Sequence, residues 1–212
     1  MKPSFISIAV LLIFGTNVNC TNRGNSRAGE EGNNDSVKTQ FNMDKNSDSA
    51  QHTQTAYFAG GCFWGTQYYF EKAKGVIDTK VGYMGGHTNN PTYEQVCSHT
   101  TGHYETIKVV FDTRITNYET MAKLFFDIHD PTQTDGQGPD IGQQYMSVVF
   151  YADSSQKQIA EKLIALLEVK GYKIATRLLP ATTFWQAEEY HEHHYDREGT
   201  TPYCHKYTDR FR

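Results

Sequence analysis

The sequence predicts a single domain of the α/β or α+β class, in which helices pack on a β-sheet. Two observations lead to this prediction. From residue 55 onward, short segments with strand periodicity alternate with longer segments with helical periodicity. The 158 residues that carry this pattern match the size of one ordinary domain, and they contain no internal repeat.

The first half of the domain is predicted to hold three strands and one helix. Residues 55–59 are a short candidate strand, and residues 66–74 follow as a helix with apolar side chains on one side. Residues 76–84 have strand propensity and run into a Gly-Gly turn signal. Residues 106–111 alternate apolar and polar side chains, which is typical of a strand with one buried face.

The second half is predicted to hold two longer helices and two more strands. Residues 117–129 and 154–170 both space their apolar side chains helically. Residues 147–151 resemble a buried strand, and residues 172–178 favour another strand. The chain from Trp185 onward is predicted to form a short helix and then a polar tail.

The composition excludes several classes of protein. With 38% hydrophobic, 13% aromatic and 21% charged residues, the chain is not wholly disordered, collagen-like or a coiled coil. A net charge of −4 argues against a nucleic-acid binder, which needs a strong excess of Lys and Arg. Four cysteines are too few for a disulfide scaffold, and the lack of a CxxC pair disfavours zinc ribbons and thioredoxin-type active sites.

Residues 1–20 have the pattern of a signal peptide. Lys2 precedes an apolar run over residues 5–14, which is too short to span a membrane but suits the hydrophobic region of such a signal. No Ala-x-Ala cleavage site follows, but Cys20 stands where bacterial lipoprotein signals place their acylated cysteine. The pattern therefore predicts export to the periplasm or the outer face of a membrane, with a lipid anchor at Cys20. The alternative is that Cys20 is lost or idle.

Residues 21–54 are predicted to be a flexible polar linker. They consist mostly of Asn, Ser, Gly, Gln, Thr and charged residues, without an amphipathic period. Such a segment cannot bury enough apolar surface to offset the entropy lost on ordering. A linker would tether the domain to the anchor, which is the one membrane contact that we expect.

Cys62 lies in a Gly-Gly-Cys-Phe-Trp-Gly segment, residues 60–65, between a predicted strand and a helix. Backbone N–H groups and the helix dipole stabilise an anion at such a position, so we expect a lowered thiol pKa and a nucleophilic thiolate. The glycines let the backbone approach another molecule closely. Phe63 and Trp64 suggest a wall for a small apolar group such as a methyl. The alternative is an inert cysteine buried among core aromatics.

Glu105 precedes a predicted strand and has the same parity as Ile107, Val109 and Phe111. Its side chain is therefore expected to point to the apolar face of that strand. Burial raises the pKa of a carboxyl, so Glu105 can stay protonated near neutrality and donate a proton. The alternative is that Glu105 reaches water at the strand end.

Two polar loops carry further candidate residues. Residues 89–94 look like a turn that presents Tyr93, and residues 137–145 form a glycine-rich loop with Asp140 and Tyr145. Loops that hold an acid and a phenol are frequent places for functional groups, although most such residues are solvated turn formers.

Seven segments occur in one order that resembles the A-type peptide methionine sulfoxide reductases: GCFWG (61–65), GYMGG (82–86), NPTYEQVC (90–97), TGHYE (101–105), HDPT (129–132), GPDIGQQY (138–145) and AEEYH (187–191). The resemblance extends from residue 55 to residue 204. It implies an α+β fold, a two-layer sandwich with a ferredoxin-like core and helices packed on a mixed or antiparallel sheet.

The resemblance also implies a role for each matching side chain. Cys62 would be the nucleophile, Glu105 the proton donor, and His191 a support that hydrogen-bonds near the site. Phe63 and Trp64 would receive the S-methyl group of the substrate. The groups that orient the sulfoxide oxygen and its water network would be Tyr93, Asp140 and Tyr145.

The implied reaction turns Cys62 into a sulfenic acid, which a second thiol condenses with to form a disulfide. Resolving cysteines of this family commonly lie in C-terminal tails, so the resemblance implies a Cys62–Cys204 disulfide. Cys97 lies in a piece that favours a helix, and we expect it to be structural. Residues 55–212 would then be a catalytic domain with a resolving tail.

The same resemblance implies the reaction partners. The substrates would be methionine S-sulfoxide in oxidised proteins and peptides, or as the free amino acid. An external dithiol such as a thioredoxin-like protein would reduce the disulfide, so no bound cofactor is expected. We expect a monomer that repairs oxidised exported proteins and binds no nucleic acid.

Two other functions stay open on the residues alone. Cys62 could act with His129 or His191 as the base of a cysteine hydrolase or acyltransferase, or the domain could be a membrane-tethered binding module with an aromatic cleft. The histidines of the Tyr-His-Glu-His-His segment, His191, His193 and His194, lack the spacing of a metal site such as HExxH, so no metal is expected.

Overall fold

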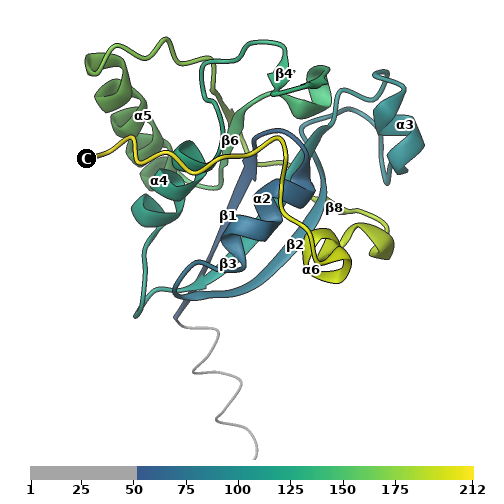
Figure 1. The fold of residues 1–212 in the computed structure, drawn as a ribbon, viewed down its shortest axis with the longest axis horizontal. Coiled ribbons are helices and arrows are strands. Elements are labelled where there is room, and N and C mark those ends of the chain that lie inside the picture. Colours follow the sequence, from purple (N-terminus) through teal and green to yellow (C-terminus); the bar gives the residue numbers. More distant parts are fainter. Residues whose placement is uncertain (1–51) are drawn as a thin grey trace, which may run out of the picture. The chain divides into compact units, whose positions relative to one another are not determined.

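The computed structural model describes residues 52–212 (Figure 1). The predicted signal peptide, Cys20 and most of the predicted linker lie outside the described residues. The linker prediction ran slightly too far, because the first strand already begins at Thr53. Within the described part of the chain, no helix is both long and apolar enough to cross a lipid bilayer.

The core follows the order β-α-β-β-α-β, which is that of a ferredoxin-like domain. Its elements are β1 (Thr53–Ala59), α2 (Phe63–Phe70), β2 (Val76–Met84), β3 (Tyr104–Asp112), α4 (Tyr118–Ile128) and β6 (Val148–Tyr151). In the sheet these strands have the order β6-β1-β3-β2, and all pairs among them are antiparallel.

Two short strands extend this sheet at its edges. β7 (Arg177–Pro180) pairs with β6 in parallel, and β8 (Trp185–Gln186) pairs with β2 in antiparallel orientation. The sheet is therefore mixed and six-stranded, with helices packed on it, which confirms the predicted α+β class.

The helices cover one face of the sheet and bury the main hydrophobic core there. α4 and α5 (Ser154–Val169) contact each other and share this core with α2, β1 and β3. At its centre, the Phe58 ring lies 4.9 Å from Phe125 and 5.4 Å from Phe70, measured between ring centroids. The apolar parity of β1 and β3 and the helical stripes of α4 and α5 meet on this face, as the sequence pattern predicts.

Two predicted elements differ in the structure. The strand expected at residues 172–178 starts only at Arg177, because only there does the chain lie beside β6; Tyr172 and Ile174 instead pack on the core from an irregular segment. The helix expected from Trp185 begins as β8. Gly82 permits this pairing, because a Cβ there would lie 2.3 Å from the Trp185 carbonyl oxygen.

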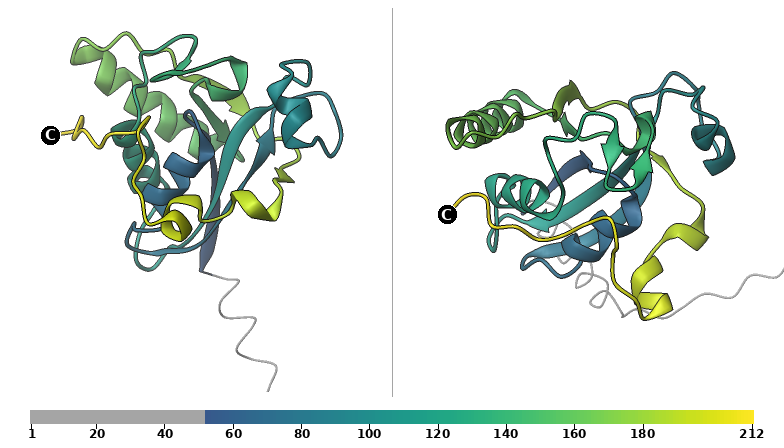
Figure 2. Two further views of the ribbon diagram at one scale, coloured as in Figure 1. Left: turned by 45° about the vertical axis from the view of Figure 1, so that its right-hand side comes forward. Right: turned by 45° about the horizontal axis from the view of Figure 1, so that its top comes forward.

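Short elements at the edges of the core carry most of the candidate site residues. They are α3 (Tyr93–Cys97), a hairpin of β4 (Gly136–Gln137) and β5 (Asp140–Ile141), the 3-10 helices η1 (Gln143–Tyr145) and η2 (Glu189–His191), and α6 (His194–Glu198). After α6 the C-terminal tail runs back across α2 and α4 in Figure 1 and in both views of Figure 2. The tail is fixed there by backbone hydrogen bonds from Lys206 to Ile128 and from Thr208 to Asp127.

Candidate active site

Cys62 is the residue that caps the N-terminus of α2. The helix begins at Phe63, three residues earlier than predicted, so the thiol is at the turn between β1 and the first helical residue. Gly61 makes this turn possible with φ +94°, a backbone conformation that favours glycine. The side chain of Cys62 is 8% exposed.

Glu105 points to the helical face of the sheet, as its parity predicts, and is 2% exposed. Its Oε2 accepts a hydrogen bond of 3.0 Å from the backbone N–H of Phe63, so the carboxyl is fixed beside the first residue of α2. Burial, followed by the charge of Cys62, raises the pKa of Glu105 well above its ordinary value, while the Phe63 N–H acts in the opposite direction. The site therefore favours a protonated carboxyl next to the Cys62 sulfur.

The prediction of a lowered thiol pKa at Cys62 is wrong for this state of the protein. The N–H of Trp64 in the first turn of α2 does lower it, as expected. The hydrogen bond with the Cys204 thiol and burial outweigh this and raise the pKa. The Cys204 thiol and burial from water thus favour the protonated form of Cys62.

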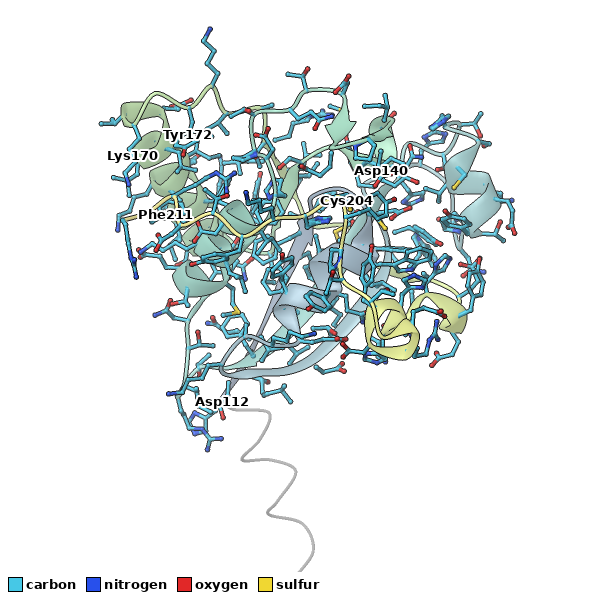
Figure 3. All side chains as sticks on the ribbon, in the orientation of Figure 1. Asp112, Asp140, Lys170, Tyr172, Cys204 and Phe211 are labelled. Carbon is cyan, nitrogen blue, oxygen red and sulfur yellow. The ribbon has the colours of Figure 1, made fainter. Side chains whose placement is uncertain are left out.

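Cys204 is buried and lies within hydrogen-bonding reach of Cys62. The predicted polar tail is therefore packed against the domain at this residue. Figure 3 shows Cys204 near the start of α2 on the tail, with Asp140 beside it. The carboxylate of Asp140 accepts a hydrogen bond of 3.1 Å from the hydroxyl of Tyr203, the residue before Cys204. Asp140 thus holds the tail where the two thiols meet.

The two aromatics after Cys62 differ in their surroundings. Phe63 is 1% exposed and packs on Tyr83, at a centroid distance of 5.9 Å. Trp64 is half-buried and stacks on His194 at 3.6 Å. Its indole Nε1 donates a hydrogen bond of 3.1 Å to Nδ1 of His191, which fixes the ring plane. Phe63 therefore belongs to the buried interior, whereas part of the Trp64 side chain stays exposed.

Tyr93 and Tyr145 approach the same carboxyl from two different elements, α3 and η1. Burial raises the pKa of both phenols, and the charge of Glu105 raises each further. The Tyr93 hydroxyl also lies within hydrogen-bonding reach of the Cys97 thiol. The fold therefore gathers two neutral phenols and a protonated carboxyl around Cys62.

His191 and His129 do not face Cys62 as a base would. His191 Nδ1 accepts from Trp64, and its Nε2 lies 3.8 Å from a carboxylate oxygen of Glu188. His129 Nδ1 donates to the Phe125 carbonyl, and its Nε2 lies 2.7 Å from the Ser147 hydroxyl. Both imidazoles are engaged elsewhere, so nothing in the geometry favours a cysteine hydrolase.

The sequence interpretation missed two residues of the site, His205 and Glu188. His205 is 5% exposed and lies between the Cys204 thiol and the Gly60 carbonyl. Glu188 accepts hydrogen bonds from the Tyr83 hydroxyl and from the backbone N–H of Tyr93, so it anchors α3. The adjacent Cys-His pair in the tail was the available signal for His205, and the AEEYH segment (187–191) was the signal for Glu188.

Across residues 52–212, no group of three or more His, Cys, Asp or Glu side chains could hold a metal ion.

Comparison with known proteins gives a consistent result. The family model described as peptide methionine sulfoxide reductase matches residues 54–212. A relative from Saccharolobus solfataricus, named peptide methionine sulfoxide reductase MsrA, is 45% identical over 71% of this chain and 86% of its own length.

Solved structures share the fold. Reduced Mxr1 from Saccharomyces cerevisiae is 32% identical and superimposes with a TM-score of 0.68, covering 73% of this chain and 90% of that one. Mxr1 in complex with Trx2 has a TM-score of 0.51 over 74% of this chain and 91% of the other; at 24% identity it supports the fold alone.

The prediction of an exported protein is contradicted by these comparisons. The matched relatives are archaeal, bacterial and yeast methionine sulfoxide reductases, and none of them supports export or a lipoprotein. The matches begin at residue 54, so the apolar run and Cys20 lie outside them. A short apolar run with a nearby cysteine is weak evidence for a lipoprotein signal, and the prediction of export that we based on it is wrong.

Family model, relatives and solved structures thus agree with one another and with the site built around Cys62. This chain belongs to the peptide methionine sulfoxide reductase family, as an oxidoreductase of the MsrA type.

Proposed function

We propose that the protein reduces the S epimer of methionine sulfoxide with Cys62 as nucleophile, Glu105 as proton donor and Cys204 as resolving thiol. One observation carries this proposal: a buried carboxyl with a raised pKa and a second thiol both lie beside the Cys62 sulfur. The residues matched by the family model also support residues 55–212 as a catalytic domain that ends in the resolving tail.

In the first step, Glu105 protonates the sulfoxide oxygen, which makes the substrate sulfur more electrophilic. The Cys62 sulfur attacks the substrate sulfur, and its proton goes to Glu105. The new S–S bond breaks again as the hydroxyl group passes from the substrate sulfur to the Cys62 sulfur. The products are methionine and a sulfenic acid on Cys62. Phe63 and Trp64 receive the S-methyl group, while Tyr93 and Tyr145 hydrogen-bond to the oxygen.

In the second step, Cys204 displaces water from the sulfenic acid and forms the Cys62–Cys204 disulfide. A thioredoxin-like dithiol then reduces this bond, and no bound cofactor takes part. Two observations support this donor. Cys204 lines a surface groove with His129 and Lys206, which gives a reductant access, and yeast Mxr1, whose reduced form is 32% identical to this chain, was also solved in complex with Trx2.

The substrates are oxidised proteins and peptides as well as the free amino acid, and the protein works as a monomer. Asp140 acts indirectly, because its hydrogen bond with Tyr203 keeps Cys204 in place. His191 likewise acts through Trp64, whose ring plane it fixes.

The test measures methionine released from each sulfoxide epimer with dithiothreitol as reductant. Wild type is expected to reduce the S epimer and leave the R epimer unchanged, while Cys62→Ser is expected to be inactive. Cys97→Ser is the matched control, since serine preserves the hydrogen bond to Tyr93. Equal activity of Cys62→Ser and wild type would refute the proposal.

A further inference from the structure

His205 is a buried imidazole that the steps above do not use, and it touches the resolving sulfur. Its Nδ1 lies 3.0 Å from Cys204 Sγ, and its Nε2 lies 2.7 Å from the backbone carbonyl of Gly60. The first distance is short for a contact between sulfur and nitrogen. The ring thus bridges the tail and the loop that carries Cys62.

The Gly60 carbonyl fixes the tautomer of this ring. A carbonyl oxygen only accepts hydrogen bonds, so Nε2 must carry a proton. Burial lowers the pKa of His205 to about 4, so the ring is neutral at pH 7 and Nδ1 presents a lone pair. The hydrogen bond at Nδ1 is therefore donated by the Cys204 thiol.

We infer that His205 is the general base of the resolving step, taking the Cys204 proton as that sulfur attacks the Cys62 sulfenic acid. The inference rests on the proposed function, because it assigns a base to its second half. It makes His205 a catalytic residue of disulfide formation and not of sulfoxide reduction.

The atoms and electrons of this step balance without another reactant. The S–S bond forms as the S–O bond of the sulfenic acid breaks, so the electron pair of that bond leaves with the oxygen as hydroxide. The Cys204 proton moves to Nδ1 of His205 and then to the hydroxide, which gives water. The imidazolium that forms in between is stabilised by the Gly60 carbonyl at Nε2.

The fold has made room for this imidazole against the catalytic loop. A Cβ at position 65 would lie 2.1 Å from Nδ1 of His205, so only glycine fits there. At position 61 a Cβ would lie 3.4 Å from Cε1 of the same ring. The glycines predicted to admit another molecule therefore admit a residue of this chain's own tail.

The charged and titratable groups around His205 leave it neutral over the working range. Asp140, held by Tyr203, raises its pKa, but less than burial lowers it. His129 on the α4 side is itself buried, and its pKa is lowered to about 3, so it brings no positive charge above pH 5. Other titratable groups on this side are the Cys204 thiol at Nδ1, Asp130, Tyr203, Lys206 and Arg210 in the same groove, and the Tyr69 hydroxyl, which reaches the His205 backbone carbonyl at 3.5 Å.

The test follows one turnover of the full-length protein without reductant. Reduced protein is mixed with methionine S-sulfoxide, samples are quenched at intervals, and methionine and the Cys62–Cys204 disulfide are both quantified from pH 5 to pH 8. In wild type, disulfide formation is expected to be independent of pH over this range. In His205→Gln it is expected to be ~100-fold slower near pH 6, the lower end of a general-base effect, and to rise about tenfold per pH unit, because the thiol must then ionise unaided.

Arg210→Ala is the control for a merely loosened tail. Arg210 donates hydrogen bonds to the carbonyls of Phe126 and Asp127, and none of its hydrogen bonds within residues 52–212 is to Cys204. This variant is expected to slow disulfide formation by the same factor at every pH. The amount of methionine in the first turnover is expected to equal that of wild type in both variants.

The outcomes separate the two proposals. If wild type releases no methionine, the proposed function fails. Suppose that wild type forms both methionine and the disulfide. The assignment of His205 as base is then wrong if disulfide formation in His205→Gln is as fast as in wild type, or if it is slowed by the same factor at every pH, as is expected for Arg210→Ala. If His205→Gln does not fold, the wild-type profile still decides, because a tenfold rise per pH unit between pH 5 and 8 would exclude a neutral base at Cys204.

Discussion

Replacing Gly65 by alanine tests whether the tail is seated as the structure shows. Gly65 lies in the first turn of α2, and its φ is not in the left-handed region, so alanine alone is compatible with this backbone. Helix propensity favours alanine by up to ~1 kcal/mol. The added Cβ, however, would overlap His205, with distances of 2.1 Å to Nδ1 and 2.7 Å to Cε1.

The clash sets the expected magnitude. Because the imidazole must leave its place, its hydrogen bonds to Cys204 and Gly60 break. Each contributes ~0.5–1.5 kcal/mol, so Gly65→Ala is expected to destabilise the domain by about 0–2 kcal/mol after the helix gain is subtracted. In a His205→Ala background the ring is gone, so the same substitution is expected to be neutral or to stabilise by up to ~1 kcal/mol.

Urea unfolding of the four variants of this double-mutant cycle measures the sign change directly. A single turnover without reductant supplies the functional counterpart: Gly65→Ala is expected to release methionine but to form the Cys62–Cys204 disulfide more slowly. The reasoning is refuted if Gly65→Ala has the same effect on the free energy of unfolding with and without His205. It is also refuted if disulfide formation proceeds at the wild-type rate.

Three further outcomes are expected. Glu105→Gln keeps an acceptor for the Phe63 N–H but loses the acid, so the rate of methionine formation in a single turnover should fall by ~10²–10⁴-fold. If the variant forms methionine at the wild-type rate, Glu105 is not the proton donor. Folding raises the pKa of Glu105, so the protonated carboxyl contributes to the stability of the folded protein. This contribution is fully present below the pKa that Glu105 has in the unfolded chain, and it is lost as the pH rises through the pKa that Glu105 has in the folded protein. The stability of wild type relative to Glu105→Gln, measured by urea unfolding, should therefore decline from pH 4 to pH 7, and a constant difference would contradict this. Phe58→Ala should cost ~3–5 kcal/mol in urea, since the ring is fully buried between helices and sheet, and a loss below 1 kcal/mol would show that the core refills the cavity.

Local patterns predicted most of the core elements. The strand over residues 76–84 has the bounds that the turn signal and propensity gave, and α4 and α5 end within about one residue of the predicted limits. These elements bury one face each, so their periodicity is visible in the sequence. β7 and β8 were misplaced because their bounds depend on where a neighbouring strand offers hydrogen bonds, and no local pattern encodes that.

For the site, local sequence patterns were enough to predict the two groups that we propose as nucleophile and acid: the glycine-flanked thiol of Cys62 and the carboxyl of Glu105, whose strand parity indicates burial. The tertiary structure decided their surroundings. Gly60 and His205 are 145 positions apart, yet they share a hydrogen bond that sets the tautomer of the ring beside Cys204. Tertiary packing likewise reversed the expected pKa of Cys62, because burial and the contact with a thiol from the tail exceed the effect of the helix terminus. Burial and long-range contacts fix protonation states, and neither is contained in the spacing of residues along the chain.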